Sequence, residues 1–137
     1  IHANNMETSI IYADKIQIKR VIMNLIANAL NYADKNSCIN INLANDKGFF
    51  RFYIENSGRP IPDKILKQLF KKYTSFSSKY AKIGIGLGLY LSKRIINAHN
   101  GNIKAESLDD MKNVFSFYIP SVRIEANRTY DKRKVTF

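Results

Sequence analysis

Residues 24–32 read Asn24-Leu25-Ile26-Ala27-Asn28-Ala29-Leu30-Asn31-Tyr32, an apolar stretch in which asparagine returns every three or four residues. The stretch is part of a longer segment whose apolar residues recur at helical spacing, at Ile18, Val21, Ile22, Leu25, Ala29 and Tyr32. This pattern predicts a helix that begins after the N-cap Asp14, ends near Ala33 and buries one face in the core.

The amides of this helix form a row beside its apolar face. Gln17, Asn24, Asn28 and Asn31 fall within an arc of roughly 60° when each residue turns the helix by about 100°. Asparagine is a mediocre helix former, so such a row costs stability unless the amides find partners. The row is therefore either a solvated face in an asparagine-rich sequence or one wall of a binding site, and the pattern alone leaves both open.

The rest of the sequence predicts strands and two more helices around this one. Strands are expected at Ser9–Tyr12, Cys38–Leu43, Phe49–Ile54, Ile103–Glu106 and Val114–Ile119. The second and third form a hairpin whose turn contains Asn45, Asp46 and Gly48. The further helices run from Pro62 to about Phe70 and from residues 84–89 to near His99. We expect an α+β fold with two layers, in which the helices pack on one face of a mixed, mostly antiparallel sheet.

Composition sets outer limits on function. The 137 residues are enough for one domain, and the single cysteine, Cys38, excludes an internal disulfide and fits a reducing compartment. No stretch approaches the roughly 18 apolar residues that cross a bilayer. The net charge of +11 allows a polyanionic partner but does not choose one.

Two further segments contain residues that suit a phosphate ligand or a turn. Residues 84–88 read Gly-Ile-Gly-Leu-Gly at the start of a helix, where free N–H groups and the helix dipole favour an anion. No strand precedes them and no Gly-Lys-Ser/Thr follows, so neither a dinucleotide-binding turn nor a P-loop fits, and a plain hinge is the alternative. Residues 56–61 read Asn-Ser-Gly-Arg-Pro-Ile and alone indicate only a turn between a strand and a helix.

Together, in this order, the three segments make the chain similar to the Bergerat-fold ATPases, which include histidine kinases, Hsp90-like chaperones, type II topoisomerases and MutL proteins. Residues 24–32 resemble the N box in its histidine-kinase form. The resemblance places the G1 box at 56–61, the F box from Leu69-Phe70 to Tyr73, the ATP lid at 74–83 and the G2 box at 84–89. It covers about residues 8–120.

The resemblance implies an ATP site that also binds Mg²⁺. Asn28 would be the catalytic residue that holds the metal, Asn56 and Ile61 would contact adenine, and Tyr32 would flank it. Further nucleotide-binding residues implied by the resemblance are Asn24, Asn31, Gly58, Phe70, Lys72, Lys82, Gly84, Gly86, Leu87, Gly88 and Leu89.

Three positions depart from the usual family pattern. Asn56 stands where the family usually has an aspartate that accepts from the adenine amino group, and a neutral amide accepts more weakly than a carboxylate. Asn31 stands where a lysine or arginine is usual, and Pro60 replaces a glycine, a variation that some histidine kinases share. Cations that could supply the phosphate charge instead are Arg59, Lys71, Lys72, Lys79 and Lys82.

Asn24 favours a kinase over a hydrolase. In ATP-hydrolysing members a glutamate base precedes the metal-binding asparagine by one helical turn, and an amide cannot take a proton near neutral pH. Phosphoryl transfer to a histidine needs mainly positioning and charge neutralisation. Neither His2 nor His99 suits the phosphoacceptor role, so we expect the substrate histidine upstream of residue 1, on a dimerisation domain.

These expectations define a protein-histidine kinase catalytic domain at residues 1–120 with a basic tail at 121–137. Its partners would be ATP, its own dimerisation and phosphoacceptor domain and a response regulator receiver domain, without nucleic acid. The fragment would be a cytoplasmic monomer cut from a membrane-anchored homodimer. A degenerate ATP-binding scaffold of the same fold is one alternative. A basic nucleic-acid-binding domain is another, although Phe50, Phe52, Phe115 and Phe117 alternate as core residues do.

Overall fold

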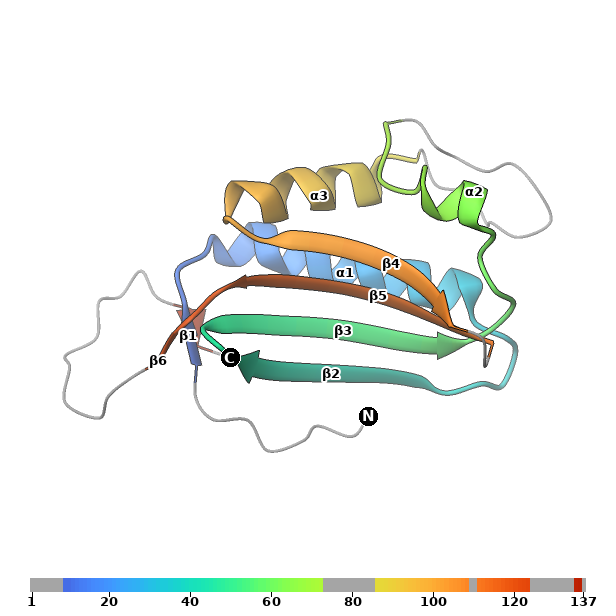
Figure 1. Cartoon of the computed structure of the whole chain (residues 1–137), viewed down its shortest axis with the longest axis horizontal. Coiled ribbons are helices and arrows are strands. Elements are labelled where there is room, and N and C mark those ends of the chain that lie inside the picture. Colours follow the sequence, from blue (N-terminus) through green and yellow to red (C-terminus); the bar gives the residue numbers. More distant parts are fainter. Residues whose placement is uncertain (1–8, 73–85, 109–110, 124–134, 137) are drawn as a thin grey trace.

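The computed structural model describes residues 9–72, 86–108, 111–123 and 135–136 of the chain. Its main sheet has four strands in the order β2-β3-β5-β4, which are Ile39–Asp46 (β2), Phe49–Ser57 (β3), Asn102–Leu108 (β4) and Lys112–Pro120 (β5). Helices α1 (Lys15–Tyr32) and α3 (Gly88–Ala98) lie on one face of this sheet, and the short helix α2 (Asp63–Leu66) follows β3 (Figure 1). The predicted two-layer α+β fold is confirmed.

Helix α1 has the bounds that its sequence predicts. The Asp14 carboxylate accepts hydrogen bonds from the backbone N–H groups of Ile16 and Gln17, at 2.9 and 3.0 Å, and so caps the first turn. Ala33 is extended and ends the helix. The predicted apolar stripe is buried at Ile18, Val21, Leu25 and Ala29 and half-buried at Ile22 and Tyr32.

The core is formed where this stripe meets the alternating residues of the two central strands. Successive strand residues point to opposite faces, and the inward series of β3 and β5 consist of Phe50, Phe52, Ile54, Phe115, Phe117 and Ile119. Phe52 and Phe117 are register partners whose rings stack with centroids 5.4 Å apart. The aromatic residues that could have served nucleic-acid binding are therefore core residues.

The β2–β3 hairpin is longer than predicted. Its strands extend through Asp46 and resume at Phe49, so the turn consists of Lys47 and Gly48 with φ of 49° and 82°. Two consecutive residues at positive φ form the tight turn that matches the twist of paired strands. The placement of Asn45 and Asp46 in the turn was wrong, because both pair with β3.

Strand β1 (Ser9–Ile11) does not join the main sheet, although a single mixed sheet was expected. It pairs antiparallel with β6 (Val122–Arg123) on one side and with β7 (Val135–Thr136) on the other. Both partners are two residues long and more than a hundred residues away in sequence, so no local pattern marks them. Every strand pairing within the described residues is antiparallel.

The other two helices are shorter than their sequence patterns suggest. Helix α2 spans only Asp63–Leu66, and turns continue the chain to residue 72. Helix α3 begins at Gly88 rather than Gly84, after Gly86 at a φ of 68°. The predicted stop is confirmed at Asn100, which has a φ of 57°. No helix within the described ranges combines the length and apolarity needed to cross a membrane.

Candidate nucleotide site

The amide row of α1 lies against the beginning of α3. The Asn24 Nδ2 donates to the backbone oxygen of Gly88 at 3.2 Å and to the Oγ of Ser92 at 3.1 Å. Ser92 is fully buried on the same face of α3 as Leu89 and Ile96, which is why its hydroxyl needs these partners. Two of the predicted boxes, 64 residues apart in sequence, are thus joined at Asn24 and Gly88.

Asn28 lies one turn further along α1 and is half-buried. Its Nδ2 donates to the backbone oxygen of Asn24 at 2.7 Å. Because only the amide nitrogen can donate to a carbonyl, this bond fixes the orientation of the side chain and directs the Oδ1 away from the helix backbone. No described residue donates to that oxygen, which is the atom that a hard cation would use. Asn31, the next member of the row, is exposed.

The carboxyl end of α1 packs against the segment that follows β3. A Cβ placed on Gly58 would lie 2.1 Å from the backbone oxygen of Tyr32, so only glycine allows this approach. The segment is held in place by a bond from the Gly58 N–H to the Met111 oxygen and one from the Asp34 N–H to the Ser57 oxygen, each 2.9 Å long. Helix α1 therefore contacts the start of α3 at Asn24 and the predicted G1 box at Tyr32.

The side chain of Asn56 lies inside this junction and makes no hydrogen bond with the described residues. Its side chain has an exposure of 0%, and neither its Nδ2 nor its Oδ1 has a partner among the described residues. Leaving such a group unpaired in the interior costs roughly 1–3 kcal/mol. A buried amide with both ends free is the kind of group that a ligand satisfies.

A second buried asparagine, Asn113, supports the same segment. It is the register partner of Asn56, and its Oδ1 accepts from the Ile61 N–H at 3.3 Å and from the Ser107 Oγ at 2.5 Å. Its Nδ2 donates to the Arg59 oxygen at 3.0 Å. Sequence reasoning missed Asn113, although it continues the inward series of Phe115, Phe117 and Ile119 by period two, which is the signal that could have identified it.

Tyr32 connects the site to the core. Its ring is half-buried and lies 6.0 Å from the ring of Phe115, measured between centroids. Burial disfavours the phenolate and raises the pKa of the Tyr32 hydroxyl above its ordinary value. The hydroxyl is therefore neutral throughout the physiological range.

The remaining predicted site residues lie in different parts of the fold. Ile61 and Leu89 are buried, Gly86 and Leu87 lead into α3, and Lys72 is exposed. The Lys93 Nζ, from α3, lies over the Phe70 ring at 6.0 Å from its centroid. Tyr73, Lys79, Lys82, Gly84 and the lid at 74–83 fall outside the described residues.

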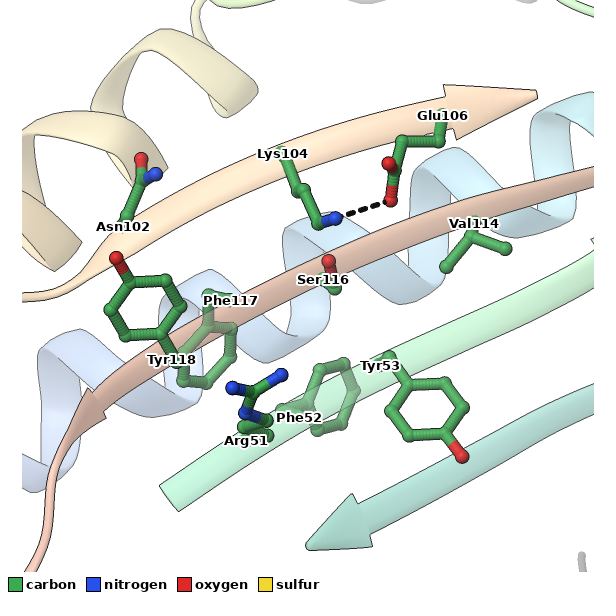
Figure 2. A pocket seen from close by; sticks show the side chains of 10 residues that line it. All are labelled: Arg51, Phe52, Tyr53, Asn102, Lys104, Glu106, Val114, Ser116, Phe117 and Tyr118. Carbon is green, nitrogen blue, oxygen red and sulfur yellow. Dashed lines mark ion pairs between the residues drawn. The ribbon is translucent and has the colours of Figure 1, made fainter. Parts of the chain in front are cut away.

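The sheet also has a hollow of about 230 Å³, lined mainly by side chains of the face that points away from α1. Figure 2 shows its lining, which comes from the three strands β3, β4 and β5 and includes Arg51, Tyr53 and Tyr118. Lys104 and Glu106, both on β4, form an ion pair of 2.7 Å along one side of it. This hollow contains none of the residues predicted to bind nucleotide.

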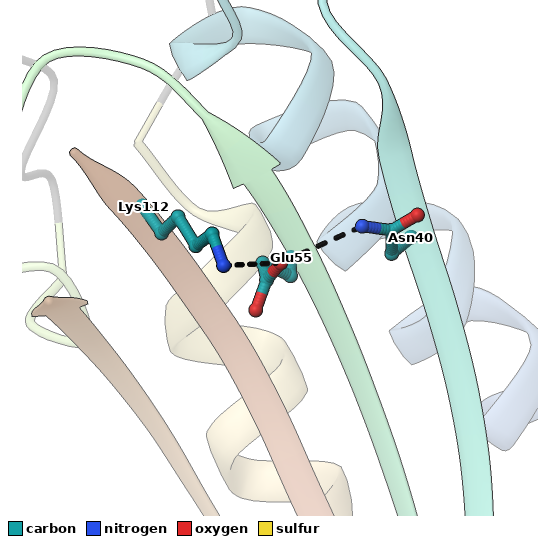
Figure 3. A network of polar contacts seen from close by, with 3 residues as sticks. All are labelled: Asn40, Glu55 and Lys112. Atoms are coloured by element: carbon teal, nitrogen blue, oxygen red, sulfur yellow. Dashed lines mark hydrogen bonds and ion pairs between the residues drawn. The ribbon is translucent and has the colours of Figure 1, made fainter. Parts of the chain in front are cut away.

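The same outer face holds a small network around Glu55. The carboxylate lies 3.5 Å from the Lys112 Nζ and 3.5 Å from the Asn40 Nδ2 (Figure 3). These groups are partly solvated, and such pairs contribute at most about 1 kcal/mol to stability. We assign them no role in the site.

Comparison with known proteins gives a match over nearly the same residues as the resemblance described from the sequence. Residues 13–123 match the family described as "Histidine kinase-, DNA gyrase B-, and HSP90-like ATPase". The chain belongs to this family. Within the histidine-kinase-like ATPases it corresponds to the ATP-binding catalytic domain of sensor histidine kinases, as the relatives below indicate.

Among curated relatives, the chain is 36% identical over 100 residues to the probable sensor kinase SilS of Salmonella typhimurium, covering 72% of this chain and 20% of that protein. Among solved structures, it resembles the catalytic domain of histidine kinase ThkA, with 32% identity, a TM-score of 0.70 and coverage of 80% of this chain and 70% of that one. It also resembles ThkA in complex with the response regulator protein TrrA, with 29% identity, a TM-score of 0.66 and coverage of 82% and 30%. The chain therefore spans about a fifth of the curated sensor kinase it matches.

Proposed function

We propose that this chain binds ATP with Mg²⁺ and transfers the γ-phosphoryl group to a histidine on a separate dimerisation domain of a two-component sensor kinase. The choice of phosphoryl transfer over ATP hydrolysis rests on the hydrogen bonds of Asn24. Its amide is engaged with Gly88 and Ser92, so the turn of α1 before Asn28 offers no proton acceptor to activate water. An incoming imidazole is its own nucleophile and needs no such base.

The residues present suit Mg²⁺ that is held together with a nucleotide. Magnesium takes oxygen ligands and is usually bound by one or two side chains plus substrate phosphates. The Asn28 Oδ1 is such an oxygen, already oriented by the bond from its Nδ2 to Asn24. Within the described residues no group of three His, Cys, Asp or Glu forms an alternative metal cage. The bound ion would neutralise phosphate charge.

Different residues of the chain would recognise the base and the phosphates of the nucleotide. The buried amide of Asn56, which has no partner among the described residues, supports a role for this residue against the base, and we assign Ile61 and Tyr32 as the other base contacts. The first turn of α3 presents backbone N–H groups without helical partners, which favour phosphate oxygens. Lys72 and Lys82 add positive charge, and the glycines of 84–88 permit close approach of the backbone.

The wider context is part of the same proposal. Residues 1–120 act as the catalytic domain and 121–137 as a basic tail, which is attached to the domain by the pairing of β6 and β7 with β1. The partners are the phosphoacceptor domain and then a response regulator receiver domain, as the complex of ThkA with TrrA supports by analogy. The parent protein is a membrane-anchored homodimer with this domain in the cytoplasm.

The test is a pair of asparagine substitutions in the full-length kinase. Asn28→Ala removes the proposed metal ligand, whereas Asn97→Ala removes an exposed asparagine near the opposite end of α3. With γ-labelled ATP and Mg²⁺, we expect Asn28→Ala to abolish acid-labile protein labelling and Asn97→Ala to retain it. Normal labelling of the Asn28→Ala protein would refute the assignment.

A scaffold without activity is the second candidate, and the neutral residues Asn31 and Asn56 are the observation that favours it. Titration calorimetry of Mg-ATP into the chain separates the two functions. Binding heat at micromolar to millimolar nucleotide supports the kinase, and none at millimolar concentration supports the scaffold.

A further inference from the structure

Asn56 differs from the other amides around the site because the protein leaves both of its ends free. Asn24 is oriented by Gly88 and Ser92, Asn28 by the carbonyl of Asn24, and Asn113 by bonds at both its Oδ1 and its Nδ2. Asn56 has none of these constraints, although it is fully buried. Its two flipped orientations, with oxygen and nitrogen exchanged, are therefore equivalent as far as the described hydrogen bonds are concerned.

The free amide matches the pairing edges of two kinds of purine. A 6-aminopurine presents a donor at position 6 and an acceptor at N1, which pair with the Oδ1 and the Nδ2 of an amide. A 6-oxopurine presents an acceptor at position 6 and a donor at N1, which pair with the same two atoms after a flip. A carboxylate has only acceptors, so it pairs with one position of either edge and repels the other. It accepts from the 6-amino group but faces the N1 acceptor of a 6-aminopurine, and it accepts from N1–H but faces the 6-oxo group of a 6-oxopurine.

We propose that this site binds 6-oxopurine nucleoside triphosphates as well as ATP, and that Asn56 is the residue that permits both. The inference rests on the proposed function, because it takes the base to lie against Asn56. Neither polar atom is exposed, so the groups that cover Asn56 must move aside when a base enters. Gly58 keeps this neighbourhood free of a side chain, since a Cβ there would lie 3.2 Å from the Asn56 Nδ2.

The primary test uses the unaltered chain. Dissociation constants for Mg-ATP and Mg-ITP are measured by calorimetry, because inosine carries the 6-oxo edge without the additional 2-amino group of guanine. A matched pair of hydrogen bonds at a base edge is worth roughly ten- to a hundredfold in affinity. We expect ITP and ATP to bind within about tenfold of each other, because the amide satisfies either edge.

The outcomes separate this inference from the function on which it rests. Binding of ATP with ITP more than about tenfold weaker overturns the inference and leaves the kinase proposal intact. Absence of binding by both nucleotides overturns the proposed function, and the inference with it.

A variant without polar side-chain atoms tests the role of Asn56 directly. In Asn56→Leu we expect both ATP and ITP to bind roughly tenfold or more weakly, because the amide that pairs with either edge is lost. Asn97→Leu, the same change at an exposed position, should leave both affinities unchanged. Unchanged affinity for either nucleotide in a folded Asn56→Leu protein would show that another group reads that base. If circular dichroism shows that this variant is unfolded, the comparison of ATP and ITP on the unaltered chain decides.

Discussion

Gly58 allows a quantitative test of the junction between α1 and the end of β3. In Gly58→Ala the new methyl group would lie 2.1 Å from the Tyr32 oxygen, and the two atoms would have to separate by more than 1 Å to reach ordinary contact. Neither side can move freely, because bonds to Met111 and from Asp34 hold the segment. Overpacking of this kind costs typically about 1–3 kcal/mol, and we expect the upper end here.

The matched control is the same substitution at Gly88. A Cβ there would lie 3.4 Å from the Asn24 Oδ1, which is ordinary contact, and Gly88 is the first residue of α3. We expect Gly88→Ala to remain within about 0.5 kcal/mol of the parent, because alanine favours a helix over glycine.

The assay is urea denaturation of the parent and both variants, with the midpoint of thermal unfolding as a second measure. For a chain of this size a loss of 3 kcal/mol corresponds to a fall of roughly 10 °C in Tm. If Gly58→Ala proves as stable as Gly88→Ala, the close approach of Tyr32 to Gly58 is wrong, and with it the placement of Asn56 beside α1.

Three further substitutions test other parts of the structure. Asp14→Ala removes the cap from two N–H groups of α1 and should lower the free energy of unfolding by about 1 kcal/mol in urea titrations; no change would contradict the cap. Asn113→Ala should cost about 2–3 kcal/mol, because it leaves buried groups of the 59–61 segment short of partners, whereas Asn97→Ala should cost little in the same titrations. Tyr32→Phe should flatten the loss of stability at alkaline pH. The pKa of Tyr32 is raised on folding, so its contribution is complete below about pH 10 and is lost as the pH rises through the folded-state pKa. Equal slopes for parent and variant between pH 9 and 11 would contradict its burial.

The elements that depend on neighbouring residues could be predicted from the sequence. Asp14 and the apolar periodicity define α1, and alternation defines the central strands, because each depends on residues within a few positions. The separation of β1 from the main sheet could not be predicted, because its partners are dipeptides at the far end of the chain. The turn at Lys47-Gly48 was misplaced because Asn45 and Asp46 are themselves common turn residues.

The candidate site was predictable where a motif marked it and not where only packing did. The motifs identified the α1 row and the glycines, and the structure brings Asn24 to Gly88 and Tyr32 to Gly58. The bonds of Asn113 and Ser107 to the 59–61 segment connect residues 46 to 54 positions apart, and neither residue belongs to a motif. That Asn56 is buried without a partner is likewise a property of the packed molecule.

The pairing of β1 with strands on both sides has a consequence for how the chain can be threaded. Ile10 faces Thr136 across the β1–β7 ladder, so the chain's outermost strands are neighbours. In a circular permutant, a short connector would join Thr136 to Ser9 and the new termini would lie at the Lys47-Gly48 turn. Every strand pairing would be preserved, while the order in which the elements are synthesised would change. Because β1 and β7 are paired neighbours, the first residue of the chain could be moved to another turn without changing the fold.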